Sequence, residues 1–220
     1  PAKHSLALLY YVCKQIWYEI GDSWIGQVTF SYDDVVTLMD RLTEDLDKVP
    51  LMRHIQVRSH NLVTSTFPFI WLVSLINSLP LKLDCLTILS GLDFEDTDEY
   101  RAIESFIKDR RGWRQLRFIS INADAIKYSQ MTLNRPQPET WRKVIQKRDG
   151  GNQNSSVTIY RADRTRARQL ATRRWGWLNA ILHESARRVY DANEAVPTDD
   201  TARLEHNLEE TMVVIDRSPV

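Results

Sequence analysis

Three short apolar segments of similar design follow one another through the middle of the chain. They are Ile55–Ser59, Leu86–Ser90 and Leu116–Ser120, and their first residues are 31 and then 30 positions apart. Each follows a stretch whose apolar residues recur at helical spacing. A fixed period in this range is typical of stacked-repeat proteins, in which each unit covers the apolar face of its neighbour. The pattern therefore predicts repeated helix–strand units.

Alternating and apolar segments predict five strands in all: Val28–Tyr32, Ile55–Ser59, Leu86–Ser90, Leu116–Ile121 and Val157–Tyr160. Helical periodicity predicts helices over residues 5–20, after Asp33 or Asp34, from about Pro68 to Leu79, and around Tyr100–Ile107. Strands that alternate with helices imply a parallel sheet, because neighbours that run the same way need a crossover. We expect an α/β fold built as a short curved solenoid, with the helices on one face. The rival arrangement is an open sheet with helices on both faces.

Changes in composition divide the chain into three parts. Residues 1–163 form the predicted α/β repeat domain, and within it residues 127–156 are rich in Pro, Gly and Asn. That stretch is expected to be a surface loop or insertion with a short helix around Trp141–Lys147. Residues 164–196 are expected to form a basic helix that packs on the repeats, and residues 197–220 an acidic tail.

Charge is distributed unevenly although the chain of 220 residues is neutral overall. Residues 1–100 hold 7 Lys and Arg against 14 Asp and Glu, residues 101–190 hold 20 against 7, and residues 191–220 hold 2 against 8. An asymmetry of this kind indicates an acidic partner for the middle block or contact between segments. The apolar runs are too short for a bilayer, which takes about 20 residues. The two cysteines favour an intracellular setting, cytoplasmic or nuclear.

Residues 8–19, Leu-Leu-Tyr-Tyr-Val-Cys-Lys-Gln-Ile-Trp-Tyr-Glu, resemble a helix found in fungal F-box-type and F-box-like proteins. In that family an "L-I-R-x-I-x-L" strand follows, and Pro50–Val57 is similar to it. Residues 113–118, Trp-Arg-Gln-Leu-Arg-Phe, resemble the degenerate leucine-rich strands that end such proteins. The resemblance covers about residues 5–125 and implies a leucine-rich-repeat-like solenoid that binds another protein.

The chain departs from this family at two points. The family's module for the Skp-type adaptor, a helical segment that opens with a Leu-Pro pair and an acidic residue, does not precede Ser5 in the sequence given. Adaptor binding is therefore an expectation for a longer parent protein only. The strict leucine-rich signature, with an Asn that closes each strand turn, is also missing.

Residue patterns that carry chemistry are scarce. The five histidines are scattered, without the spacing of a zinc site. The acidic run over residues 93–99 lacks the glycine and the distal Glu of a calcium loop, and it suits the N-terminus of a helix better. The Gly-rich phosphate loop and the Gly-x-Ser-x-Gly elbow are both missing from the sequence. We therefore expect neither enzyme activity nor a cofactor or metal.

An arginine-rich segment with interleaved aromatics is the main candidate site. It begins at Arg161, and its candidate binding residues are Arg164, Arg166, Arg168, Arg173, Arg174 and Trp175. Arginine forks suit phosphates and aromatic rings stack on bases, so nucleic-acid binding through residues 161–174 is one reading. The others are an acidic protein partner, or a helix whose charged side meets water or the acidic residues 191–220.

Tryptophans outside the apolar stripes add a second indication of an interaction surface. Trp24, Trp113, Trp141 and Trp175 lie off the clearest core positions, and exposed Trp, Tyr and Arg carry much of the energy at protein interfaces. The sequence therefore predicts a non-enzymatic protein–protein interaction scaffold. It would be a substrate-recognition or scaffolding subunit that binds through the strand face or the arginine-rich helix, with a nucleic-acid-binding protein as the alternative.

Overall fold

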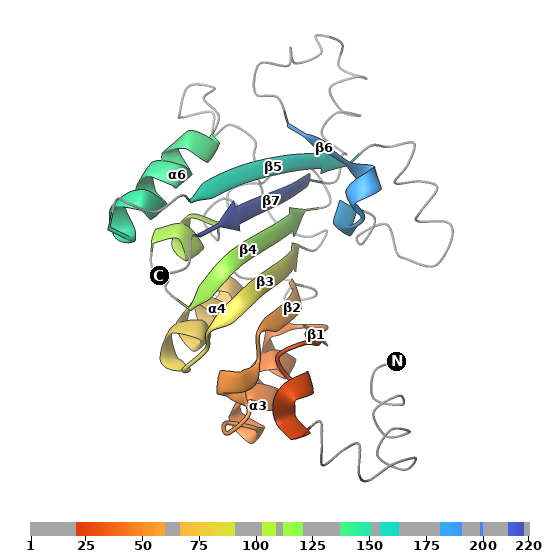
Figure 1. Cartoon of the computed structure of the whole chain (residues 1–220), viewed down its shortest axis with the longest axis vertical. Coiled ribbons are helices and arrows are strands. Elements are labelled where there is room, and N and C mark those ends of the chain that lie inside the picture. Colours follow the sequence, from red (N-terminus) through yellow and green to blue (C-terminus); the bar gives the residue numbers. More distant parts are fainter. Residues whose placement is uncertain are drawn as a thin grey trace.

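A seven-stranded mixed sheet organises the molecule, with the strands in the order β1-β2-β3-β4-β7-β5-β6 (Figure 1). The computed structural model describes residues 21–59, 67–90, 103–108, 112–120, 137–150, 155–162, 181–190, 199 and 211–217. The strands are β1 Thr29–Tyr32, β2 His54–Ser59, β3 Leu83–Ser90, β4 Trp113–Ser120, β5 Ser156–Ala162, β6 Arg187–Val189 and β7 Thr211–Asp216. The α/β class predicted from the sequence is therefore confirmed.

All five strands expected from the apolar segments are present, and β1 to β4 pair in chain order and in parallel. The fifth, β5, does not lie next to β4. Strand β7 separates the two and pairs antiparallel with both, so β5 runs in the same direction as β4 without touching it. The expectation of five neighbouring parallel strands is thus correct for four strands and wrong for the fifth.

Strand β7 comes from the segment that the charge pattern places in an acidic tail. Its residues Met212, Val213 and Ile215 are fully buried. The strand forms hydrogen-bonded ladders with a neighbour on each side, and both of its faces are covered by apolar side chains. Burial on both faces of a strand yields a continuous apolar run without alternation. Residues 211–216 are therefore part of the sheet and not of a separate tail.

The helices of the described residues pack against a single face of the sheet (Figure 1). They are α3 Val35–Glu44, α4 Phe67–Ser78, a short helix over residues 103–108 and α6 Gln137–Arg148. Asp34 caps α3, because its carboxylate accepts a 2.7 Å hydrogen bond from the backbone N–H of Thr37. The expected N-terminal helix over residues 5–20 lies outside the described residues.

One core joins these helices to the sheet. Its sheet residues occupy alternate positions of neighbouring strands, and its helix residues follow the predicted stripes. The main members are Leu38, Leu42, Ile55, Val57, Leu72, Ile76, Leu86, Ile88, Phe106, Leu116, Phe118, Ile145, Val213 and Ile215. The one-sided helix layer agrees with the predicted arrangement over the described elements, and it leaves the opposite face of the sheet to be covered by something else.

Helix α6 corrects the expectation for residues 127–156. The predicted loop or insertion contains this 12-residue helix, which is longer than the short helix expected around Trp141. Trp141 is 1% exposed and Trp113, in β4, is 2% exposed, so both belong to the core and not to an exposed interface. Trp24 is half-buried and packs on Phe30. A position outside the apolar stripes of the sequence did not indicate an exposed tryptophan, because contacts with residues distant in the chain bury these rings.

The end of the predicted basic helix is not helical. The described residues 181–190 contain a 3-10 turn, η5 Glu184–Ala186, followed by β6. Arg187 donates hydrogen bonds to the carbonyl oxygens of Ile181 and Leu182, and β6 pairs with β5. These tertiary contacts outweigh the local helical periodicity. Residues 164–180 lie outside the described residues.

A buried ionic cluster, the Asp149 cluster, fastens the ends of several elements together. It consists of Asp149, Arg148, Arg217 and Trp113. The Asp149 carboxylate accepts a hydrogen bond from Nε of Arg217 at 2.7 Å and another from Nε of Arg148 at 2.9 Å. Each arginine also donates a second hydrogen bond to it. Both guanidinium groups lie over the Trp113 ring, with their central carbons 5.2 and 5.7 Å from its centroid.

Further hydrogen bonds connect the Asp149 cluster to the surrounding backbone. Arg217 donates to the carbonyl oxygen of Trp113 at 2.7 Å, and Arg148 donates to that of Ile107 at 2.6 Å. Burial alone would raise the pKa of Asp149, but the hydrogen bonds and charges of the two arginines outweigh it, so the pKa is lowered. The cluster therefore joins the end of α6 to β4, to the helix over residues 103–108 and to the residue after β7.

Candidate functional site

The face of the sheet opposite the helices carries polar side chains over its first strands. The register of the strand pairs aligns these side chains in rows, because paired residues on neighbouring strands lie side by side. The first polar row is Thr29, His54, Cys85, Gln115 and Asp216, from β1 across to β7. The second polar row is Ser31, Gln56, Thr87 and Arg117. Strands β1 to β4 thus each contribute polar residues at two alternate positions of the same face, and β7 contributes Asp216.

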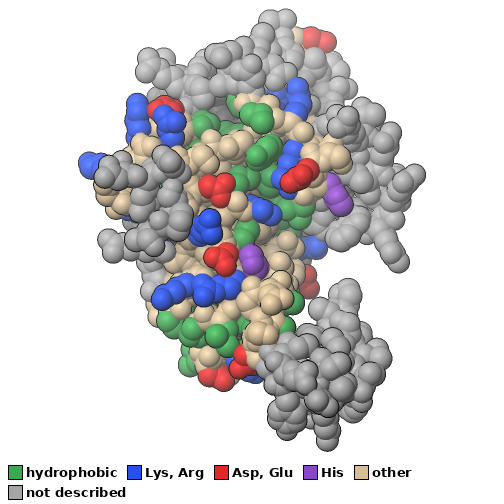
Figure 2. Space-filling model, in the orientation of Figure 1, with side chains coloured by type: hydrophobic (Ala, Val, Ile, Leu, Met, Phe, Trp, Pro, Cys, Tyr) green, Lys and Arg blue, Asp and Glu red, His purple; other side chains and the backbone are tan. Residues whose placement is uncertain are grey.

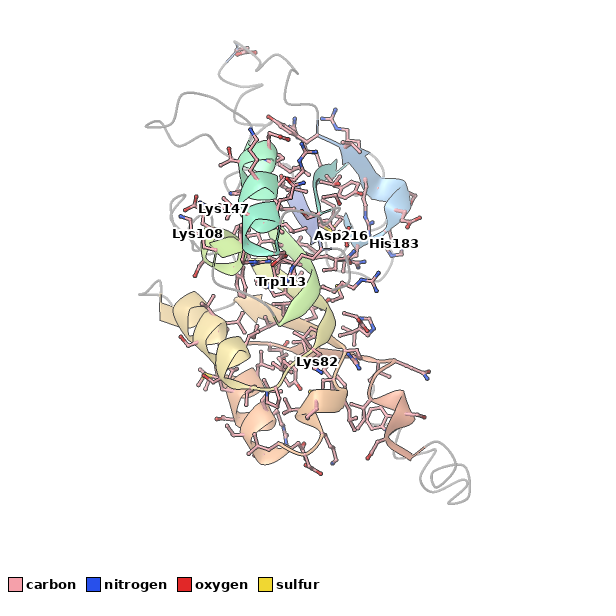
Figure 3. All side chains as sticks on the ribbon, turned by 60° about the vertical axis from the view of Figure 1, so that its left-hand side comes forward. Lys82, Lys108, Trp113, Lys147, His183 and Asp216 are labelled. Carbon is pink, nitrogen blue, oxygen red and sulfur yellow. The ribbon has the colours of Figure 1, made fainter. Side chains whose placement is uncertain are left out.

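From β3 onward, a third row on this face is apolar and covered. Leu89, Ile119 and Met212 are aligned with Tyr160 and pack against Ile181 and Leu182 in a second, smaller core. The segment that carries η5 therefore covers the carboxyl-end part of this face near β4, β7 and β5. Figure 3 shows Asp216 and His183 on the side of the sheet away from α4 and α6, whereas Lys108 and Lys147 lie on the helix side.

The two polar rows, apart from Ser31, form the floor of an open groove with a volume of about 560 Å³, which we call the polar groove. Its lining includes residues from β1, β2, β3, β4 and β7, together with Leu182 from the covering segment. Acidic, basic and histidine side chains lie close together over the middle of this face (Figure 2). The lining comes from five neighbouring strands, which suits an extended ligand.

Gln115 holds the centre of the groove in a fixed geometry. Its side-chain Oε1 accepts hydrogen bonds from Nε of Arg117 at 2.6 Å and from the thiol of Cys85 at 3.5 Å. Its Nε2 donates to Oδ1 of Asp216 at 2.6 Å. Both ends of the amide are therefore committed, and the side chains of three strands are linked into one rigid floor.

Cys85 is the only cysteine among the described residues that line the groove, and a thiol is a potential nucleophile. Burial raises the pKa of its thiol, and the nearby Arg117 charge and the Thr87 hydrogen bond do not offset this. The thiol is consequently protonated near neutral pH, whereas nucleophilic catalysis and metal binding both need the thiolate. Among the described residues, three or more His, Cys, Asp or Glu side chains do not converge on a position that could hold a metal ion.

The arginine-rich candidate site falls almost wholly outside the described residues. Arg164, Arg166, Arg168, Arg173, Arg174 and Trp175 all lie between residues 163 and 180, which the structure does not describe. Arg161, the first arginine of that segment, is 0% exposed on β5, with its guanidinium carbon 5.6 Å from the centre of the Tyr190 ring. A side chain buried in this way does not reach a phosphate backbone.

The residues of the polar groove were not named individually from the sequence, although the strand face was expected to bind. The signal was present: Gln56, Thr87 and Arg117 are the polar residues that alternate with apolar ones inside the three repeated segments. The sequence does not give the register of the strand pairs, and it is this register that places Arg117 beside Thr87 and Asp216 beside Gln115. Asp216 in particular lies in a strand that the sequence did not predict.

Comparison with known proteins adds no relative. No family model matches the chain, no curated protein matches it, and no solved structure is similar enough to count as a match. In the described part of the chain, no helix combines the length and the apolar character that crossing a bilayer requires.

Proposed function

We propose that the chain is a non-enzymatic protein–protein interaction domain that binds its partner in the polar groove. One observation carries the proposal. Two rows of polar side chains, one across five strands and one across four, line up on the face that the helices leave open, and hydrogen bonds centred on Gln115 fix their geometry. A preformed, rigid floor lowers the entropy cost of binding an extended partner.

The chemistry of the groove favours binding over catalysis. A general base must lie within hydrogen-bond reach of the group that it activates. The hydrogen bonds of Cys85 go to Thr87 and Gln115 within the described residues, and burial keeps the thiol protonated. Gln115 and Thr87 do not titrate in the physiological range. These features supply hydrogen bonds and shape, which are the requirements of recognition.

The wider context of this proposal comes from the sequence. The resemblance of residues 8–19 and 50–57 to F-box-like proteins supports a leucine-rich-repeat-like domain of an intracellular substrate-recognition or scaffolding subunit. The parallel run from β1 to β4 with helices on one face is compatible with a unit of that kind. Strand β7 pairs antiparallel with β4, so the parallel run ends at β4.

Affinity capture from the source cell tests the proposal. The full chain is compared with Gln56→Trp, which places a bulky ring in the groove, and with Thr43→Trp, which places the same ring on the exposed side of α3. We expect the captured partner to be lost with Gln56→Trp and kept with Thr43→Trp. The same partner captured by all three chains would refute binding through the groove.

The alternative proposal is nucleic-acid binding through residues 161–174. It is supported by the excess of 20 Lys and Arg over 7 Asp and Glu in residues 101–190, although buried Arg161 makes no contribution. Neutralised phosphates release counterions, so RNA binding of this kind would weaken steeply with salt. RNA that binds at low salt and is released from a chain with Arg164, Arg168, Arg173 and Arg174 all replaced by Ala would favour this alternative.

A further inference from the structure

Arg114 and Arg117 line the polar groove together with the carboxylates of Asp84 and Asp216, and Arg187 lies near Arg117. The ion pairs within the described residues do not include Arg114, Arg117 or Arg187. Arg187 is occupied by backbone carbonyl oxygens, which carry no net charge. Burial first, and then repulsion by the charge of Arg117, lower the pKa of Arg187, and the charges of Tyr160 and Glu184 oppose this only in part. An added carboxylate would relieve this repulsion.

Arg117 is the arginine that is placed to receive an anionic group. It projects from the middle of β4 into the second polar row, and it lines the groove. Its Nε is used in the hydrogen bond to Gln115, and its guanidinium donates to no other described residue. The two terminal nitrogens are therefore available to a ligand in the groove, and a guanidinium fork matches the two oxygens of a carboxylate. Because Gln115 fixes the guanidinium plane, little entropy is lost when the carboxylate binds.

The length of the groove indicates a peptide. The first polar row runs from Thr29 on β1 to Asp216 on β7, across five neighbouring strands. Strands lie about 4.8 Å apart, so the row is about 19 Å long, which equals about six residues of extended chain at roughly 3.3 Å each. Along this length Thr29, Gln56 and Thr87 offer donors and acceptors to a peptide backbone, and Leu182 offers an apolar wall beside Arg117.

We propose that the polar groove binds an extended acidic segment of a partner protein, in which Arg117 receives the carboxylate of one Asp or Glu side chain. This inference rests on the proposed function and specifies the chemistry of the partner. The Oδ1 atom of Asp216 is held by Gln115, and its second oxygen is placed to accept a backbone N–H of the same segment. The carboxylate of Asp216 excludes a second acidic residue from that end, so the segment carries one acidic residue at a defined position.

Selection from a random heptapeptide display library on the immobilised full chain tests this inference. We expect Asp or Glu to be enriched about tenfold at one position on the wild-type chain, as a charge-assisted fork would give. The enrichment should disappear on Arg117→Gln, decrease on Arg117→Lys, and change to Lys or Arg on Arg117→Glu. Arg142→Gln is the matched control, because Arg142 lies on the exposed side of α6, and it should select the same peptides as the wild type.

Three results would overturn the inference: peptides selected without an acidic preference, an acidic preference that survives Arg117→Gln, or selection no better than on a blank surface. Competition by a 20-nucleotide RNA that depends on Arg117 would also overturn it, because the occupant would then be a nucleic acid. A failure here is distinguishable from failure of the proposed function. If capture still depends on Gln56 while the acidic preference is absent, the groove binds a protein of different chemistry.

Discussion

Replacement of Asp149 by Ala should destabilise the fold strongly, because it removes the only anion from the Asp149 cluster while both cations stay in place. The side chain of Asp149 is 4% exposed and that of Arg217 is 6% exposed. Four hydrogen bonds join the carboxylate to the two guanidinium groups, at 2.7 to 3.1 Å. After the substitution, two adjacent positive charges would remain buried over the Trp113 ring without the carboxylate that pairs with both of them.

The magnitude follows from the cost of an unpaired buried charge. Removal of one partner of a buried pair costs about 3–5 kcal/mol, and the Trp113 ring and the carbonyl oxygens that still accept from the arginines place this cluster at about 3 kcal/mol. For a chain of this length, 1 kcal/mol corresponds to about 2–4 °C, so we expect the Tm to fall by roughly 6–12 °C.

Urea denaturation followed by tryptophan fluorescence measures the effect on the free energy of unfolding. Glu139→Ala is the matched control on the same helix, because it breaks the exposed Glu139–Arg142 ion pair, which is worth at most about 0.5 kcal/mol. The reasoning is refuted if Asp149→Ala and Glu139→Ala lower the free energy of unfolding by the same amount. A double-mutant cycle with Arg217→Ala should show a coupling energy above about 1 kcal/mol.

Four further outcomes are expected. The pKa of Asp149 is lower in the folded chain than in the unfolded chain, so the wild type should be more stable than Asp149→Asn. This advantage is complete above the unfolded carboxyl pKa of about 3.9 and is lost as the pH falls through the lower folded value. Urea titrations at several pH values measure it, and an advantage that persists undiminished well below that range would contradict the reasoning. Deletion of residues 211–217 should abolish cooperative unfolding, because β4 and β5 both lose their partner strand, and circular dichroism during heating checks it. Ile215→Ala should cost about 2–5 kcal/mol in urea, as for other fully buried side chains, and a loss below 1 kcal/mol would argue against a buried β7. In a Cys13→Ser chain, Cys85 should react with iodoacetamide at pH 8 more slowly than free cysteine, because burial raises its thiol pKa, and an equal rate would indicate an ionised thiol.

Local periodicity was enough to predict the parallel part of the sheet. The segments around Ile55, Leu86 and Leu116 each alternate apolar and polar residues within one helix–strand unit. Their strand character and direction can therefore be predicted from the local sequence. The core stripes of α3 and α4 were predicted for the same reason, because a helix face is set by residues three and four positions apart.

The parts that could not be predicted depend on contacts between distant residues. Strand β7 is a short apolar run in an acidic context, and only its pairing with β4 and β5 makes it a strand. The apolar residues from Ile181 to Val189 have helical spacing, yet the segment is not a helix. The hydrogen bond from Arg187 to the carbonyl oxygen of Ile181 and the pairing of β6 with β5 stabilise another structure. The polar groove could not be predicted for a related reason. The sequence contains Arg117 and Asp216, but only the register of the strands places both side chains on the floor of one groove.

The position of β7 also bears on how the protein is made. Gln115 of β4 and Asp216 of β7, which hydrogen-bond to each other, are 101 positions apart in the chain. While a ribosome is still adding the intervening residues, β4 presents a bare row of amide and carbonyl groups that can pair with another nascent chain. We therefore expect maturation after synthesis to depend on chaperones that shield this row, and slow elongation between the two strands to increase the aggregated fraction.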